Sequence, residues 1–207
     1  MSGIQGTVWS GTVAEMTVND VYFSEVEWHL RPVALLGAKL SYEISAQPAG
    51  GFFESVMSVG ITGSVRLQQM RASLPLSAIA GVSGIRGLTG SASVQMESLT
   101  IENGFVSEAD GVIGIADVRL PLIGTQNLGG YEAVVTTLDD GLIASVEDTD
   151  GVVDIAGALQ VEADRSFSFL AAVAAKPDTP ENIAQRLQFL PPASSPGKRE
   201  LRLEGTL

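Results

Sequence analysis

The feature that most constrains this chain is a two-residue alternation of apolar and polar side chains, which returns along most of its length. It is longest in residues 36–46 and recurs in residues 26–30, 153–163 and 201–207. Side chains point alternately to the two faces of a strand, so this period indicates strands with one buried and one solvated face. In the longest segment the apolar face consists of Leu36, Ala38, Leu40, Tyr42, Ile44 and Ala46.

Short turn sequences separate these segments. Asn-Gly and Asp-Gly pairs supply the positive φ angles that tight hairpins need. We therefore predict about a dozen strands, joined mostly by hairpins. The turn signals are Asn19-Asp20, Ala49-Gly50-Gly51, Asn103-Gly104, Asp110-Gly111, Asp140-Gly141 and Asp150-Gly151.

One segment near the end of the chain has a helical pattern instead. Thr179 is the predicted N-cap of this helix, Pro180 its first residue, and Pro191-Pro192 ends it. The apolar stripe of the helix consists of Ile183, Leu187 and Leu190. A second, short turn of helix is expected in residues 74–81, and the glycine-rich residues 81–90 are the best candidate for a mobile loop.

These patterns predict an all-β fold class in one domain of residues 1–207. A long amphipathic sheet has to hide its apolar face, so we expect a strongly curved antiparallel sheet with one short α-helix near the C-terminus. Such a sheet forms a partly closed barrel or a half-barrel. Trp9 and Trp28 are predicted to be buried core anchors, and truncating either to Ala is expected to cost about 3–5 kcal/mol.

The apolar face of such a sheet can be buried in two ways. Its side chains can interdigitate into a packed core, or they can line an apolar trough that needs a partner or a lipid. We favour the packed core, because small residues among the large ones permit close approach of facing parts of the sheet. The residues expected to face inward are Leu40, Tyr42, Ile44, Met57, Val59, Val118, Leu120, Leu159, Phe167 and Phe169.

The composition of the chain limits the classes of partner that it can bind. The chain has 207 residues, no cysteine, and 12 basic against 24 acidic residues, which gives a net charge of −12. This charge repels phosphate backbones, so no nucleic-acid partner is predicted. The strand pattern begins without a signal peptide or an apolar run that could cross a membrane. We therefore expect that one transmembrane helix precedes Gly3 in the natural protein.

Residues with catalytic or metal-binding chemistry are few. His29, the single histidine, lies on the polar face of a predicted strand and is interpreted as an exposed residue rather than a catalytic base. Residues 148–154 begin like a calcium loop, but the third ligand and the closing Glu are missing, which favours a hairpin turn. Residues 84–90 lack the phosphate-loop lysine, which favours a bent hairpin. Four nearby carboxylates are interpreted as solvated: Asp139, Asp140, Glu147 and Asp148. We predict no enzyme, no catalytic residue, no cofactor and no metal site.

Several motifs in one order resemble the periplasmic part of the type II secretion system protein N family. They are "GTVWSG" in residues 6–11, "WHLRPVALLGAKL" in residues 28–40, "GLTGSASVQMESLTIENG" in residues 87–104, "LGGY" in residues 128–131, "GALQVEADRSFSFLAAV" in residues 157–173, and the closing "LRLEGTL". The resemblance implies a non-enzymatic component of the bacterial type II secretion apparatus. It would be the periplasmic domain of an inner-membrane subunit, tethered through an anchor absent from this chain and acting in assembly or scaffolding. The alternative is a binding module whose apolar trough carries a lipid or another hydrophobic ligand.

An open sheet also suggests how such a protein meets its partners. The expected edge strands lie near residues 7–13 and 201–207, and free backbone groups there allow another chain to add a strand. We expect a weak homodimer or docking of another secretion subunit at these edges. Proline at Leu203 is expected to abolish association while the β structure survives.

Overall fold

The structure is a computed structural model that describes residues 2–18, 21–32, 40–60, 63–78, 87–121 and 126–206. Most of the expected mobile loop in residues 81–90 lies outside these ranges. So do residues 33–39, which carry the start of the longest alternating segment.

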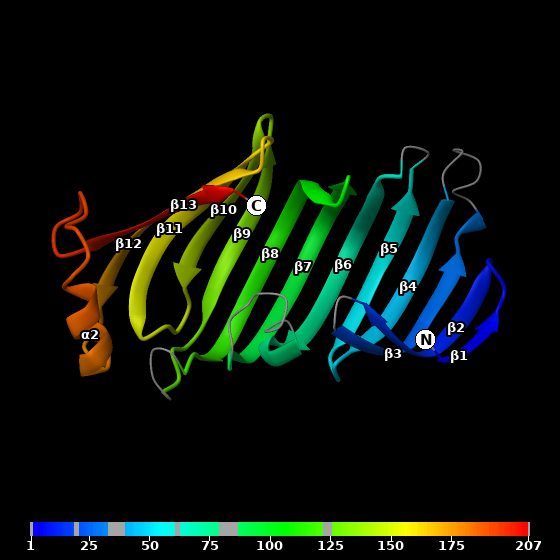
Figure 1. Ribbon diagram of the computed structural model, residues 1–207, viewed down its shortest axis with the longest axis horizontal. Coiled ribbons are helices and arrows are strands. Elements are labelled where there is room, and N and C mark those ends of the chain that lie inside the picture. The colour runs from blue at the N-terminus through cyan, green and yellow to red at the C-terminus, as the bar shows by residue number, and fades with distance from the viewer. Residues whose placement is uncertain are drawn as a thin grey trace.

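Within these ranges, thirteen strands form one antiparallel sheet in which every strand pairs with its neighbours in the sequence. This arrangement confirms the predicted all-β class (Figure 1). The sheet does not close, because β1 and β13 lie at its opposite ends. The strands are β1 Ser2–Gly6, β2 Ser10–Val18, β3 Val21–Leu30, β4 Leu40–Pro48, β5 Phe52–Val59, β6 Val65–Pro75, β7 Thr89–Glu102, β8 Phe105–Arg119, β9 Tyr131–Leu138, β10 Gly141–Asp148, β11 Val153–Glu162, β12 Ser166–Ala175 and β13 Arg199–Thr206.

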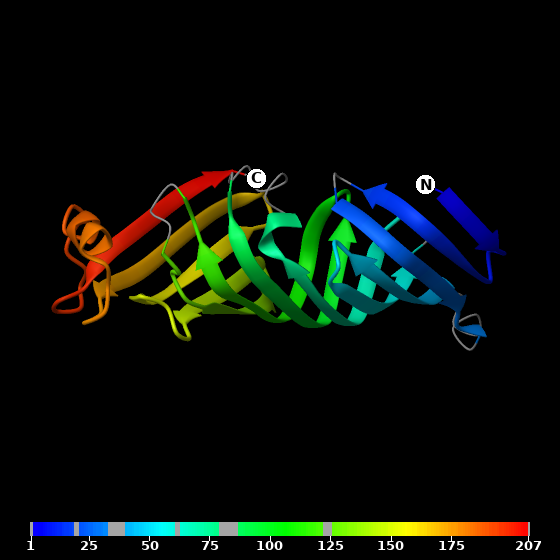
Figure 2. The same cartoon turned by 90° about the horizontal axis from the view of Figure 1, so that it is seen from below.

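Local backbone irregularities explain why the sheet curves (Figure 2). Glu25, Gln69 and Asp117 have φ angles of 50°, 52° and 54°, although none of them is glycine. Each lies inside a strand where the pairing register shifts by a residue. Such bulges bend a strand and increase its twist, so the curvature is distributed over β3, β6 and β8.

The predicted turn at Asn19-Asp20 lies outside the described ranges, and of the other turn signals all but one mark the connection between two strands. Asn103-Gly104 forms a tight turn with φ angles of 51° and 77°, as the type I′ geometry requires. Asp110-Gly111, in contrast, lies in the middle of β8. There Gly111 faces Met96, and a Cβ atom at Gly111 would stand 2.2 Å from the carbonyl oxygen of Gln95. This glycine therefore allows a close approach between strands, which the sequence does not distinguish from a turn.

The two faces of the sheet differ in chemistry. Residues paired across strands share a face, so one row of partners identifies each side. The apolar face carries Ala46, Phe53, Ala72, Val94, Ile113, Ala133, Val146, Gly157, Ala171 and Leu201. The other face, here called the grooved face, carries Glu54, Arg71, Gln95, Val112 and Val134.

The apolar face carries one buried cluster and is only partly covered elsewhere. Leu76, Ala92, Val118, Leu128 and Ile183 form a buried cluster. Along the rest of the face, two of the predicted inward residues stay open, since Leu40 is 45 % and Val59 is 38 % exposed. Among the described residues no large side chain is less than 2 % exposed. The expected packed core is thus incomplete, because a single sheet lacks a second layer to cover its face.

Helix α2 spans Glu181–Leu187 and contributes Ile183 to this cluster. Ile183 is buried and Leu187 is half-buried, as the apolar stripe predicts, but Leu190 lies beyond the helix. The N-cap is Pro180 and not Thr179. The hydroxyl of Thr179 instead accepts the N–H of Lys176 at 2.6 Å and donates to the carbonyl of Val152. Residues 76–78 are helical, as expected in part, while Leu74 and Pro75 belong to β6.

The two tryptophans have different environments, and the prediction that both are buried is wrong for Trp9. Trp9 is 58 % exposed in the turn between β1 and β2, where no element covers it. Trp28 is half-buried on the same face as Val26 and Leu30. Its Nε1–H donates to the carbonyl of Thr7 at 3.1 Å, and its ring lies where a side chain on Gly11 would be. Gly11 therefore provides the space for Trp28.

We expect the two tryptophans to respond differently to truncation. Trp28→Ala removes a half-buried ring and its hydrogen bond, so it should lower the free energy of unfolding by about 2–3 kcal/mol. Trp9→Ala removes an exposed ring and should cost less than about 1 kcal/mol. Urea denaturation of each variant measures the cost, and iodide should quench mainly the emission lost in Trp9→Ala. Equal costs would contradict this assignment.

Candidate functional site

The two open edges of the sheet are the first candidate site. The first predicted edge, residues 7–13, is corrected by the structure, because β1 pairs outside β2 and is itself the edge strand. The short β1 segment, SGIQG, lacks a clear alternation, so its sequence does not reveal a strand. At the other end, β13 spans most of the predicted residues 201–207.

Only part of the outer side of β13 is open. The N–H of Glu200 donates to the carbonyl of Pro191 at 2.8 Å, and the N–H of Ala193 donates to the carbonyl of Lys198 at 3.0 Å. Residues 191–193 therefore cover the beginning of the strand. Backbone groups alternate in direction along a strand, so those of Arg202 and Glu204 also point outward. The described residues include no strand beyond them.

This direction corrects the variant suggested by the sequence. Leu203 pairs with Phe169, and its N–H points inward to β12. Proline at Leu203 would therefore remove a hydrogen bond inside the sheet and would not act only on the free edge.

The open part of β13 carries charges on one face and an apolar residue on the other. Arg202 and Glu204 lie on the grooved face and form an ion pair at 2.6 Å, with side chains that are 64 % and 55 % exposed. Leu203 lies on the apolar face and is 55 % exposed. An exposed ion pair contributes little to the stability of the fold. Arg202, Glu204 and Leu203 can therefore contact another chain without loss of stability.

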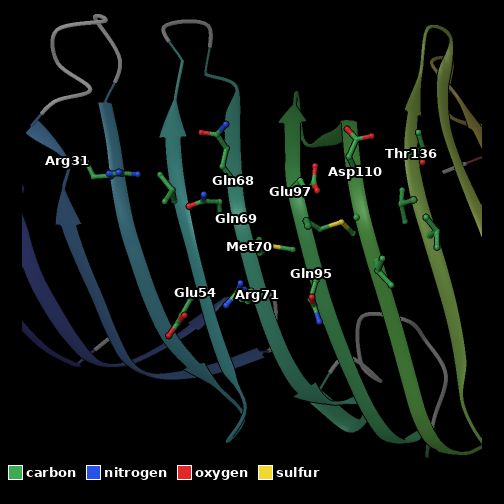
Figure 3. Close-up of a pocket in the computed structure, with 16 residues that line it drawn as sticks. Arg31, Glu54, Gln68, Gln69, Met70, Arg71, Gln95, Glu97, Asp110 and Thr136 are labelled. Atoms are coloured by element: carbon green, nitrogen blue, oxygen red, sulfur yellow. The ribbon is translucent and has the colours of Figure 1, made fainter.

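A groove on the grooved face is the second candidate site. Its volume is about 1120 Å³, and it crosses β5, β6, β7, β8 and β9 (Figure 3). Glu54, Arg71 and Gln95 are cross-strand partners that line it. Carboxylate, guanidinium and amide groups of this kind suit a polar ligand, and they do not form the close acid–base pair that hydrolysis needs.

Asp110 also lines the groove, but its carboxylate is occupied by neighbouring strands. It accepts the N–H of Thr137 at 3.0 Å, the hydroxyl of Thr137 at 3.0 Å and the hydroxyl of Ser98 at 3.2 Å. The hydrogen bond from the backbone of Thr137 is the main reason that the pKa of Asp110 is lowered. Asp110 therefore ties β8 to β7 and β9 as a structural carboxylate.

The structure also places the residues that the sequence singles out for chemistry. His29 is exposed beside Arg31 and Glu43 in a smaller hollow. Asp148 pairs with Lys176, and Asp154 pairs with Lys198 at 2.8 Å, so two of the three carboxylates of the calcium-like segment have lysine partners. Within the described ranges, no group of three or more His, Asp or Glu side chains is placed to hold a metal ion.

The "LGGY" segment has a structural role that the sequence does not predict. Gly129 and Gly130 pack against Asp150, and Gly151 packs against the ring of Tyr131. The Tyr131 hydroxyl donates to the carbonyl of Leu128 at 3.0 Å. Burial, reinforced by nearby carboxylates, raises the pKa of Tyr131. The pair of adjacent glycines is the sequence signal that could have indicated this close packing.

Asp148 links the sheet to the segment that leads into α2. Burial alone would raise its pKa, but hydrogen bonds from Lys176 Nζ and from the N–H of Ile155 lower it overall from its ordinary value of 3.8. A lowered folded-state pKa means that this carboxylate stabilises the fold above the unfolded pKa. That contribution is lost as the pH falls through the folded-state pKa.

We expect Asp148→Asn to lower the free energy of unfolding by about 1–2 kcal/mol at pH 7. The difference from the wild type should shrink as the pH falls below about 4, where the carboxylate of the unfolded chain becomes protonated, and should vanish below the lower folded-state pKa. Glu147→Gln is the control, because Glu147 is exposed in the same strand and should cost little at any pH. Urea denaturation at pH 3 and pH 7 tests this, and a cost of Asp148→Asn that is independent of pH would contradict it.

Three comparisons place the chain among known proteins. The family model described as "Type II secretion system (T2SS), protein N" matches residues 1–202. The "Type II secretion system protein N" of Aeromonas hydrophila is 23 % identical over 225 residues, which cover 100 % of this chain and 84 % of that relative. No solved structure matches the chain. No helix in the described ranges is long and apolar enough to cross a membrane. The match over nearly the whole chain means that it belongs to the type II secretion system protein N family, a family of components of the type II secretion apparatus.

Proposed function

We propose that this chain is the periplasmic part of an inner-membrane subunit of the type II secretion apparatus. It forms one domain of residues 1–207 and acts in assembly or scaffolding without catalysing a reaction. The observation that carries the proposal is a single continuous sheet that, within the described ranges, ends at two edge strands, β1 and β13, with β13 covered only at its start. Family membership supports the assignment to the apparatus.

Edge strands suit a scaffolding role because they bind through the backbone. An unpaired edge presents N–H and C=O groups at fixed spacing, and a strand from another protein can extend the sheet there. In this chain the backbone groups of Arg202 and Glu204 are directed outward for this purpose. We propose that other secretion subunits dock at these edges.

Site-specific photocrosslinking in cells that carry the complete secretion apparatus tests this role. A photoreactive residue replaces Ile4 in β1 or Arg202 in β13 of the full-length protein, and Glu132 in the interior strand β9 is the exposed control outside the groove. Crosslinks to other secretion subunits should form from the edge positions and be much weaker from Glu132. Equal crosslinking from all three positions would refute edge docking.

Protease protection in spheroplasts checks the location. A periplasmic domain should be cleaved by added protease when the inner membrane is intact. Protection under that condition would contradict the proposed placement.

A second candidate function is supported by the partly covered apolar face. Leu40 and Val59 remain exposed on it, and α2 covers only the opposite end. A soluble protein seldom leaves such a surface without a partner, so a lipid or another hydrophobic ligand could occupy it. Leu159 lies half-buried on this face between Ala144 and Phe169.

Native mass spectrometry of protein purified from cells, followed by lipid extraction, separates the two candidates. If the protein carries a lipid, an acyl ligand should be present in stoichiometric amount, and Leu159→Asp should remove it without unfolding the protein. Absence of bound lipid, together with unfolding that added fatty acid does not shift, leaves scaffolding as the function.

A further inference from the structure

We propose that two copies of this chain associate through β13, antiparallel to each other, with Leu203 of one copy opposite Leu203 of the other. The inference rests on the proposed use of edge strands and names a second copy of this chain as one occupant of the β13 edge. Three observations select this partner and this register: the covered start of β13, the order of its charges, and its exposed leucine.

The covered start of β13 limits where a partner strand can bind. Residues 191–193 occupy the outer side next to Lys198 and Glu200. The free edge therefore runs from Leu201 to Thr206. Its outward backbone groups belong to Arg202, Glu204 and Thr206, so hydrogen-bonded pairs with a partner strand can form only at these residues.

A two-fold symmetric pairing of this edge has few possible registers. With Arg202 opposite its own copy, the arginines face each other, and Glu200 faces Glu204. With Glu204 opposite its own copy, like charges again meet. With Leu201 at the centre, the partner strand would collide with residues 191–193. Like charges directly opposite each other are unfavourable, so these registers are disfavoured by charge or excluded by the covered edge.

The register centred on Leu203 brings opposite charges together on the free part of the edge. Only its outermost pair, Thr206 opposite Glu200, meets the covered start of the strand, so the last residues of each copy turn away from the partner. Arg202 of each copy lies opposite Glu204 of the other, and both are outward residues that exchange backbone hydrogen bonds. Since Arg202 already pairs with Glu204 within one strand, the two copies form a ring of four alternating charges. The two Leu203 side chains meet in the non-hydrogen-bonded pair, where side chains approach most closely. Both copies then present their apolar faces on the same side of one continued sheet.

The β1 edge has no feature that would select one pairing register over another. Its residues Ser2–Gly6 carry no charged side chain, so no register is favoured electrostatically. The small area of a six-residue edge also means that the β13 dimer is weak and depends on protein concentration.

Charge reversal tests the pairing in the purified chain by sedimentation velocity over a range of concentrations. Arg202→Glu and Glu204→Arg should each weaken self-association about ten-fold, because two attractive cross-strand pairs become repulsive. An equimolar mixture of these two variants should associate as tightly as the wild type, since every cross-strand pair is again of opposite charge. The double variant Arg202→Glu/Glu204→Arg should also recover, and Glu147→Arg in interior strand β10 is the control without effect.

Cysteine crosslinking tests the register directly, because the chain has no natural cysteine. A non-hydrogen-bonded antiparallel pair has a Cα spacing of about 4.5 Å, which a disulfide can span. Leu203→Cys should therefore form a symmetric disulfide dimer about ten-fold faster than Leu201→Cys, whose copies are offset in this register. Far-ultraviolet circular dichroism confirms that both variants are folded.

The outcomes separate this inference from the proposed function. A wild-type chain that stays monomeric at all concentrations, reversals that do not rescue each other, or equal crosslinking at Leu201 and Leu203 would overturn the dimer. If edge photocrosslinks to other secretion subunits persist in that case, edge docking stands and only the second copy is wrong. A β13 dimer without any crosslink to secretion subunits supports the inference and refutes the docking role.

Discussion

Gly129→Val is expected to lower the free energy of unfolding by about 3–5 kcal/mol, a large effect for one residue. Gly129 has a φ of +84°, a conformation that a β-branched residue adopts only with strain. A Cβ atom there would stand 2.2 Å from the carbonyl oxygen of Asp150 and 2.6 Å from the Cα of Gly151. Both obstacles are backbone atoms, so the neighbouring turn would have to move.

Gly104→Val provides the matched control. Gly104 has a φ of +77°, but nothing lies within 4 Å of the position that a Cβ atom would take. It should therefore show only the cost of backbone strain, about 1–3 kcal/mol. Urea denaturation of both variants measures the difference, which is the cost of the close contact at Asp150. Equal losses would mean that backbone conformation alone explains the glycine in the "LGGY" segment.

Local pattern was sufficient to predict the strands whose two faces differ. The alternation in residues 40–48 arises because β4 lies inside the sheet, with one face more covered than the other. Residues 2–6 form an edge strand that is exposed throughout its described side chains, so no alternation marks it. Trp9 shows the same limit, because a bulky apolar residue predicts burial only if another element is present to cover it.

The candidate site was predictable only in outline. Hairpin connections favour neighbouring strands, so an antiparallel sheet with an edge at its last strand followed from the sequence. The free length of β13 did not, because it depends on how residues 191–193 fold back onto Lys198 and Glu200. The groove was also missed, since its lining residues come from five strands and only the twist of the sheet brings them into one hollow.

Helix α2 contributes one residue, Ile183, to the buried cluster on the apolar face. Ile183 is 7 % exposed and belongs to a cluster with Leu76, Ala92, Val118 and Leu128. These partners come from segments distant in the sequence, so the cluster joins the helix to the middle of the sheet. We therefore expect damage at Ile183 to destabilise the whole fold rather than the helix alone.

Ile183→Asp should lower the free energy of unfolding by about 4 kcal/mol or more, because it removes buried apolar volume and places a carboxylate among apolar side chains. Gln185→Asp is the control, since Gln185 is exposed on the same helix and receives the same charge. It should cost less than about 1 kcal/mol. Thermal and urea denaturation measure both losses, and hydrogen exchange shows where protection decreases. If protection is lost only in residues 181–187 while the amides of β8 and β12 remain protected, α2 is a detachable cover, and the stability of the sheet does not depend on this cluster.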